Sequence, residues 1–328
     1  MNMPLLCILA FFLSFVLCAL ITAWLLPRLR AMKMGQRILE IGPVWHAKKE
    51  GTPTMGGLAF LIGTLLLLIL LLPWLTEQMT SKERYALLVT VLFCIANGAI
   101  GIVDDVTKLR HHRNEGLTPW QKLTLQTTFA AAFLALLRIG GILDEQLHLS
   151  FLGRIPMGFA TYFVWMVMIL GSVNCANLTD GIDGLAASVA AVIFAFYALL
   201  SARLFAMPPA VIAALLLGCA VAFLFFNRHP AKIFMGDTGS LFLGGAIAVG
   251  AISLKMPLIL IIAGGIYLIE TLSVIIQVTS FKLTGKRVFK MSPIHHHFEM
   301  CGLNEKKIVL LFSAVTILLC GIAYITVF

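Results

Sequence analysis

Ten long apolar stretches restrict this chain to folds that can exist in a lipid bilayer. Crossing ~30 Å of hydrocarbon takes about 20 helical residues. Stretches of that length run approximately over residues 4–27, 55–73, 85–103, 123–140, 159–176, 185–201, 209–227, 239–256, 258–280 and 307–327. Because they are continuously apolar and lack the alternation of membrane strands, they predict helices. We therefore expect an all-α integral membrane protein with about ten transmembrane helices, formed as a single domain over residues 1–328.

The basic residues predict how these helices are oriented. Of the 24 Lys and Arg residues, 18 lie in or beside the loops after the first, third, fifth, seventh and ninth stretches. The positive-inside rule places those loops in the cytoplasm and both termini on the periplasmic or extracellular side. The net charge of +9 is then explained by topology and by attraction to anionic membrane lipids. It gives no reason to expect a nucleic-acid partner.

Two adjacent acids, Asp104 and Asp105, begin the loop after the third stretch, and Lys108 follows them. Acids at the C-terminal end of a helix face an unfavourable helix dipole, and adjacent carboxylates repel each other. A metal ion, a bound proton or Lys108 would offset this repulsion. The alternative interpretation is a pair of solvated acids at a helix end.

A second polar element repeats every three residues after the fifth stretch. Its members are Asn174, Asn177, Asp180 and Asp183. On a helix each would lie about 60° from the last, which forms one polar strip. An Asx-rich turn between two spans is the alternative. The number of Asn, Asp and Gly residues exceeds what a turn requires, which favours a ligand site.

A third element, Phe234-Met235-Gly236-Asp237, precedes the eighth stretch, and Asn227 ends the seventh. Asp237 could cap the following helix or bind a cation, and the two roles are compatible because helix N-termini also attract phosphate. A hard divalent cation such as Mg²⁺ prefers carboxylate and phosphate oxygens. The sequence therefore predicts a magnesium site formed by Asp237 with Asp104 or Asp105.

The fourth element consists of three consecutive histidines, His295, His296 and His297. Neighbouring side chains on a helix point ~100° apart, so the three rarely converge on one zinc ion. Imidazoles that bind a pyrophosphate fit this pattern better, because histidine supplies hydrogen-bond donors without a permanent charge. A solvated loop is the alternative.

Together these motifs resemble the phospho-N-acetylmuramoyl-pentapeptide transferases. The matching strings occur in the same order over residues 35–307 and include Gly42–Lys49, Gly51-Thr-Pro-Thr-Met-Gly-Gly57 and Pro293-Ile-His-His-His-Phe-Glu299. The Asp-Asp and Asn-x-x-Asp-Gly-x-Asp-Gly motifs are shared with the wider superfamily of polyprenyl-phosphate N-acetylhexosamine-1-phosphate transferases. The histidine and Gly51–Gly57 strings resemble the muramoyl-pentapeptide branch in particular.

The resemblance implies a membrane enzyme of bacterial cell-wall peptidoglycan synthesis, multi-pass in the cytoplasmic membrane. Its substrates would be UDP-MurNAc-pentapeptide and undecaprenyl phosphate, its products lipid I and UMP, and its cofactor Mg²⁺. The implied catalytic residues are Asp104, Asp105, Lys108, Asp237, His295, His296 and His297, with Asp237, Asp104 and Asp105 at the metal. The implied substrate-binding residues are Lys48, Lys49, Lys122, Asn174, Asn177, Asp180, Asp183, Asn227 and Phe234. Phe234 would stack on uracil.

Two other functions compete with this one. A sister transferase moves GlcNAc-1-phosphate onto the same lipid and lacks the His-His-His-Phe-Glu string. An ion-coupled transporter would carry acids near mid-bilayer, but only Glu270 lies well inside a predicted span, and no role is assigned to it. Ser and Gly residues in the stretch 239–256 indicate close helix packing, which is compatible with a homodimer without establishing one.

Overall fold

The chain is mainly helical. A computed structural model describes residues 3–32, 49–77, 79–110, 116–143, 145–149, 153–257 and 259–328. In chain order the elements are α1 (Met3–Ala31), α2 (Leu58–Glu77), α3 (Ser81–Arg110), α4 (Pro119–Ile139), β1 (Gln146–Leu149), β2 (Gly153–Pro156), α5 (Ala160–Thr179), α6 (Leu185–Arg203), α7 (Met207–Asn227), α8 (Gly236–Ser253), α9 (Ile259–Ala263), α10 (Gly265–Thr284), α11 (Ile294–Met300) and α12 (Glu305–Val327).

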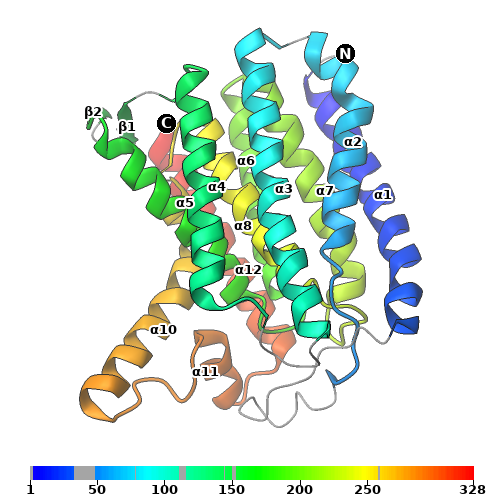
Figure 1. The fold of residues 1–328 in the computed structure, drawn as a ribbon, viewed down its shortest axis with the longest axis vertical. Coiled ribbons are helices and arrows are strands. Elements are labelled where there is room, and N and C mark those ends of the chain that lie inside the picture. The colour runs from blue at the N-terminus through cyan, green and yellow to red at the C-terminus, as the bar shows by residue number, and fades with distance from the viewer. Residues whose placement is uncertain are drawn as a thin grey trace.

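The long helices form a bundle that confirms the predicted class of all-α membrane protein. Within the described ranges, nine helices are long and apolar enough to cross a membrane, namely α1 to α7, α10 and α12. Most of them run side by side in Figure 1. Each of the nine overlaps one of the ten predicted stretches, because apolar length alone predicts a membrane helix.

The remaining predicted stretch, 239–256, corresponds to α8, which is buried inside the bundle. Of its 18 residues, 14 are buried, and it packs mainly against α3 and α5. Its glycines permit this packing: a Cβ on Gly244 would lie 2.6 Å from the Cα of Val173, and a Cβ on Gly250 would lie 2.6 Å from the ring of Tyr197. The small residues of this stretch therefore serve packing within one chain, and they need no homodimer to explain them.

The prediction of one continuous helix over 258–280 is wrong. Helix α9 ends at Ala263, and α10 begins at Gly265. Gly264 and Gly265 lie at the break, and glycine favours helix ends and kinks because it is conformationally free. As a result α10 leans out of the bundle, with α11 beside its lower part (Figure 1).

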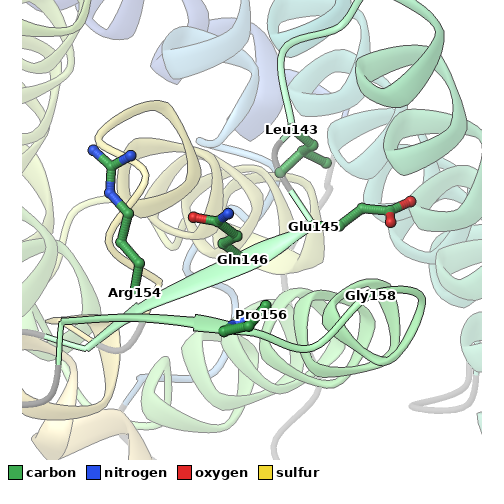
Figure 2. Close-up of a pocket in the computed structure, with 6 residues that line it drawn as sticks. All are labelled: Leu143, Glu145, Gln146, Arg154, Pro156 and Gly158. Carbon is green, nitrogen blue, oxygen red and sulfur yellow. The ribbon is translucent and has the colours of Figure 1, made fainter.

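A short β-hairpin between α4 and α5 also departs from the all-α prediction. Its two strands are antiparallel, with Leu147 opposite Ile155. The hairpin lines a cavity between Glu145 and Arg154 (Figure 2). The hairpin lies at the opposite end of the bundle from the polar loops (Figure 1), so the cavity that it lines is not where the predicted site residues gather.

The two ends of the bundle differ in what they carry. Both chain termini lie at the upper end in Figure 1, together with the hairpin. The C-terminal ends of α3, α5, α7 and α10 and the short helix α11 lie at the lower end. All four polar elements predicted from the sequence therefore share one end of the molecule.

Candidate functional site

Close helix contacts bring the predicted acids together. Asp104 and Asp105 lie near the end of α3, and Asp237 is the second residue of α8. A Cβ on Gly101 would lie 2.3 Å from the carbonyl oxygen of Asp237, and a Cβ on Gly236 would lie 2.6 Å from a carboxylate oxygen of Asp105. Because neither glycine has a side chain, α3 and α8 approach closely enough for the three carboxylates to meet.

We call Asp104, Asp105 and Asp237 the acidic cluster. Each can supply an oxygen that lies within 4.8 Å of an oxygen of both others. Asp104 is 0% exposed and Asp105 is 3% exposed. Buried carboxylates are costly unless they are paired or bind a cation, so this cluster requires positive charge nearby.

Two lysines supply that charge. Lys108 Nζ lies 2.6 Å from Asp104 Oδ2 and 3.2 Å from Asp237 Oδ1. Lys122 Nζ, from the start of α4, lies 3.0 Å from Asp104 Oδ1 and 2.5 Å from Asp237 Oδ2. Each ammonium thus bridges the same two acids, and the site carries both the anions that hold a metal and the cations that hold phosphates.

Asp105 has a different task from its neighbour. It accepts hydrogen bonds from the backbone amides of Asp237 and Thr238, and from the Thr238 hydroxyl at 2.7 Å. Asp105 belongs to α3, but it accepts hydrogen bonds from amides in the first turn of α8. It therefore acts on α8 as an N-cap side chain would. The interpretation of Asp237 as the cap of its own helix is wrong, because the cap position is Met235 and carries no side-chain cap bond.

The acidic cluster fits a magnesium ion by its chemistry. Magnesium binds through one or two carboxylates together with phosphate and water oxygens. The cluster offers three carboxylates from two helices, and Asp237 is held from the side by Asn177, whose amide donates to Asp237 Oδ1 at 3.1 Å. Which of the three would contact the ion stays a prediction.

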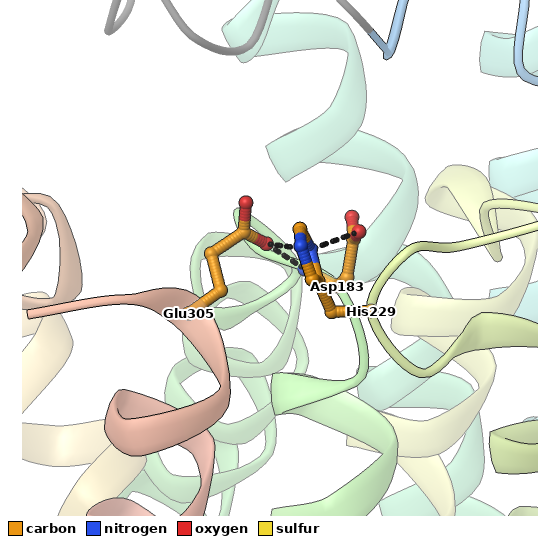
Figure 3. Close-up of side chains that lie close together, drawn as sticks. All are labelled: Asp183, His229 and Glu305. Carbon is orange, nitrogen blue, oxygen red and sulfur yellow. Dashed lines mark hydrogen bonds and ion pairs between the residues drawn. The ribbon is translucent and has the colours of Figure 1, made fainter.

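A second group of polar residues, the Lys49 cluster, consists of Asp183, His229 and Glu305, which Figure 3 shows close together, and of Lys49, which forms ion pairs with both acids. Lys49 Nζ lies 2.8 Å from Asp183 and 2.7 Å from Glu305. His229 Nδ1 lies 2.9 Å from Asp183 Oδ2. These four residues come from four separate segments of the chain. The cluster therefore connects the loop before α2 with the loop after α5, the loop after α7 and the start of α12.

The Gly51–Gly57 string pairs with the Phe234–Asp237 string through the backbone. The amide of Phe234 donates to Pro53 at 2.8 Å, and the amides of Gly56 and Gly57 donate to Phe234 and Met235, both at 2.9 Å. This pairing fixes the approach to α8 and leaves the Phe234 ring half-buried at the site. Two motifs that are almost 180 residues apart thus form one short ladder.

Comparison with known proteins matches these same segments. A family model described as Glycosyl transferase family 4 matches residues 86–255, just over half of the chain. A signature described as phospho-N-acetylmuramoyl-pentapeptide-transferase signature 1 matches residues 49–61. Curated proteins named phospho-N-acetylmuramoyl-pentapeptide-transferase are 45% identical in Clostridium botulinum Eklund 17B over 92% of this chain and 90% of the relative, and 44% identical in Geobacillus kaustophilus over 95% and 94%.

The chain belongs to the phospho-N-acetylmuramoyl-pentapeptide-transferase family. A third member, from Clostridium perfringens SM101, is 43% identical over 97% of this chain and 95% of its own length. The signature of this transferase family contains Lys49 and the Gly56–Gly57 pair, and the broader family match contains the whole acidic cluster. The motifs quoted from the sequence therefore contain the whole acidic cluster, and Lys49 and Asp183 of the Lys49 cluster.

Several of the predicted substrate-binding residues lie at the two clusters. Lys49, Lys122, Asn177 and Asp183 lie in the two clusters. Asp180 follows the last residue of α5, and burial together with the charges of Asp237, Asp105 and Asp183 raises its pKa well above the usual range. Lys48 lies outside the described residues.

Two residues that were predicted to bind the substrate instead form hydrogen bonds within the protein. Asn227 is 2% exposed, its carbonyl accepts from the Gly184 amide, and its amide donates to the Ile233 carbonyl. Asn174 donates to Gln126 and to its own helix. Both side chains hold loops or helices together, which makes them poor candidates for direct contact with a substrate.

The three histidines on α11 each have a separate partner. His295 Nδ1 lies 3.0 Å from Glu270, and His296 Nδ1 lies 2.7 Å from Glu299. His297 Nδ1 accepts from the amide of Lys290. The three Nδ1 atoms thus have different partners, while the ring centroids of His295 and His296 lie 4.1 Å apart.

Sequence reasoning missed His229, Glu305 and Thr238 as members of the site. His229 follows Asn227-Arg228 in a polar loop, and only this position in the sequence could have indicated that it belongs to the site. Glu305 lies 122 residues from Asp183, whose amide donates to it. Only the three-dimensional fold brings such distant residues together.

Proposed function

We propose that the protein transfers phospho-N-acetylmuramoyl-pentapeptide from its UDP carrier to undecaprenyl phosphate, giving lipid I and UMP for bacterial peptidoglycan. The observation that carries this proposal is the pair of lysines that bridge Asp104 and Asp237 at the end of a membrane bundle, in a chain of this transferase family. Such a site can hold a charged pyrophosphate beside the membrane while the lipid chain stays in the bilayer.

The reaction exchanges one pyrophosphate bond for another. A phosphate oxygen of the lipid attacks the β-phosphorus of the UDP-linked sugar, and UMP leaves with the electron pair of the broken bond. Because the bonds formed and broken are alike, positioning and charge stabilisation supply most of the catalysis. Lys108 and Lys122 are placed to bind the phosphate oxygens, since each already spans Asp104 and Asp237.

Magnesium would be held by Asp237 with Asp104 or Asp105. When bound, the ion would neutralise charge on the transferred phosphates. Asp105 would in addition keep the first turn of α8 in place through Thr238, so that Asp237 stays aligned with Asp104. Asp104 and Asp237 share Lys108 and Lys122, which keeps both carboxylates close enough to share a ligand.

The Lys49 cluster is proposed as the nucleotide side of the site. Phe234 offers an aromatic face for uracil, and Asp180 and Asp183 lie on the loop between α5 and α6, where Asp183 accepts a hydrogen bond from Lys49. Lys49 and His229 give this side hydrogen-bond donors beside the carboxylates of Asp183 and Glu305. The cluster would face the cytoplasm of a bacterial cell, since 18 of 24 basic residues lie on that side.

A comparison of two donor substrates tests the proposal. Purified protein in detergent would receive undecaprenyl phosphate, Mg²⁺ and either UDP-MurNAc-pentapeptide or UDP-GlcNAc, and UMP would be measured. We expect UMP only with the muramoyl-pentapeptide donor. UMP from UDP-GlcNAc alone would assign the protein to the sister transferase activity, and no UMP from either donor would reject a phosphosugar transferase.

A further inference from the structure

Glu270 is a buried acid that the reaction as described does not use. It lies on α10 and is 0% exposed, while Leu268, Ile269 and Leu272 on the same helix are exposed on the apolar surface. An isolated carboxylate in such surroundings is expensive, and intramembrane acids normally have a partner. Glu270 therefore needs a specific reason to be there.

Its partner is the first histidine of the α11 motif. Both carboxylate oxygens of Glu270 lie 3.0 Å from His295 Nδ1, and His295 is itself 0% exposed. A carboxylate at one ring nitrogen keeps a proton on that nitrogen and fixes the ring orientation. The remaining nitrogen, Nε2, is then the only atom of this ring able to act on something else.

That second nitrogen is buried and unused. His295 Nε2 has no hydrogen-bond partner among the described residues. A Cβ on Gly181 would lie 2.2 Å from it, so the ring edge faces the Asp180–Asp183 loop at a position where the chain has no side chain. A buried polar atom without a partner is costly, which indicates that Nε2 is kept for a ligand.

We infer that Glu270 is a positioning residue that holds His295 with Nδ1 protonated and Nε2 directed at the Asp180–Asp183 loop, where Nε2–H donates to a phosphate oxygen of the nucleotide substrate. The inference rests on the proposed function, because that function supplies the phosphate. Donation from Nε2 while Nδ1 keeps its proton requires the doubly protonated ring, and the Glu270 carboxylate lies beside that ring as its counter-ion. His296 with Glu299 repeats the same Nδ1–carboxylate arrangement within α11.

A double-mutant cycle tests the inference. Glu270→Gln, His295→Gln and the double variant would be assayed for UMP release from UDP-MurNAc-pentapeptide, with thermal unfolding measured on each. We expect Glu270→Gln to lower kcat roughly 10- to 100-fold, as found for partners that orient functional histidines, with KM for both substrates and the unfolding temperature little changed. The double variant should be no slower than His295→Gln, because Glu270 acts through His295.

Two further variants guard against a purely structural effect. Ser273→Ala changes another buried residue of α10, whose hydroxyl donates only to the Glu270 carbonyl, and should keep wild-type kcat. Gly181→Ala leaves Glu270 in place but pushes the ring from the other side, and should reproduce the kcat loss if Glu270→Gln unfolds. Wild-type kcat in folded Glu270→Gln, wild-type kcat in Gly181→Ala where Glu270→Gln does not fold, or losses that add in the double variant would overturn the inference. Absence of UMP from the wild-type protein would instead reject the proposed function itself.

Discussion

Gly101 on α3 lies directly against the backbone of Asp237 on α8, where a Cβ at position 101 would be 2.3 Å from the Asp237 carbonyl oxygen. This contact lets two membrane helices bring Asp104 and Asp237 to the same pair of lysines. The absence of one methyl group therefore supports the geometry of the whole acidic cluster.

Gly101→Ala should disturb this cluster. The added methyl must displace backbone, because no flexible side chain can yield, and overpacking of this kind costs about 1–3 kcal/mol. A shift of Asp237 by about 1 Å should lower UMP release ~100-fold. Gly171→Ala on α5, where a Cβ would meet nothing within 4 Å, is the matched control for rate and unfolding temperature. Equal rates in the two variants would show that the contact is unimportant.

Lys49→Met should weaken nucleotide binding more than it slows the chemical step. The substitution removes the ammonium that lies between Asp183 and Glu305, and the two carboxylates then repel each other. Charge-assisted hydrogen bonds contribute about 1.5–3 kcal/mol, so KM for UDP-MurNAc-pentapeptide should rise at least ~10-fold. KM for undecaprenyl phosphate should not change.

Lys306→Met provides the control for Lys49→Met. It removes the same charge from an exposed position next to Glu305, and its kinetics should match the wild type. A KM for the nucleotide donor that is unaffected by Lys49→Met would exclude the Lys49 cluster from the nucleotide side of the site.

The sequence predicted the spans and most of the acidic cluster because both depend on local features. Long apolar stretches must be helices in lipid, and Asp104, Asp105, Lys108 and Asp237 stand at the ends of such helices. The helix break at Gly264 was not predictable by length, since a continuous apolar stretch is equally compatible with one straight span.

The pairings between distant segments could not be read from the sequence. Asp105 serves the first turn of α8 through Thr238, 133 residues away. The sequence suggests that Asn227 binds the substrate, but its side chain forms hydrogen bonds with the backbone of Gly184 and Ile233. Such assignments depend on which groups a residue meets in the folded chain, and residue type alone does not determine that.

Cysteine labelling should place the two clusters on the cytoplasmic side. Glu77 ends α2 and Thr284 ends α10 at the other end of the bundle, and both are exposed. In a background without the exposed Cys301, an impermeant thiol reagent should label Glu77→Cys but not Thr284→Cys in intact cells, and both after permeabilisation. The opposite pattern in intact cells would reverse the orientation.

The metal dependence of the acidic cluster is tested most directly by rates of UMP release from UDP-MurNAc-pentapeptide and undecaprenyl phosphate. Wild-type protein and Asp237→Asn would be compared in excess chelator and across a Mg²⁺ titration. Loss of the Asp237 charge removes a ligand for a hard cation and the shared partner of Lys108 and Lys122. We expect the wild type to be inactive in chelator and restored by Mg²⁺, and Asp237→Asn to stay at least ~100-fold slower at saturating Mg²⁺ while remaining folded. Full wild-type activity in chelator, or a wild-type rate in Asp237→Asn, would contradict the account.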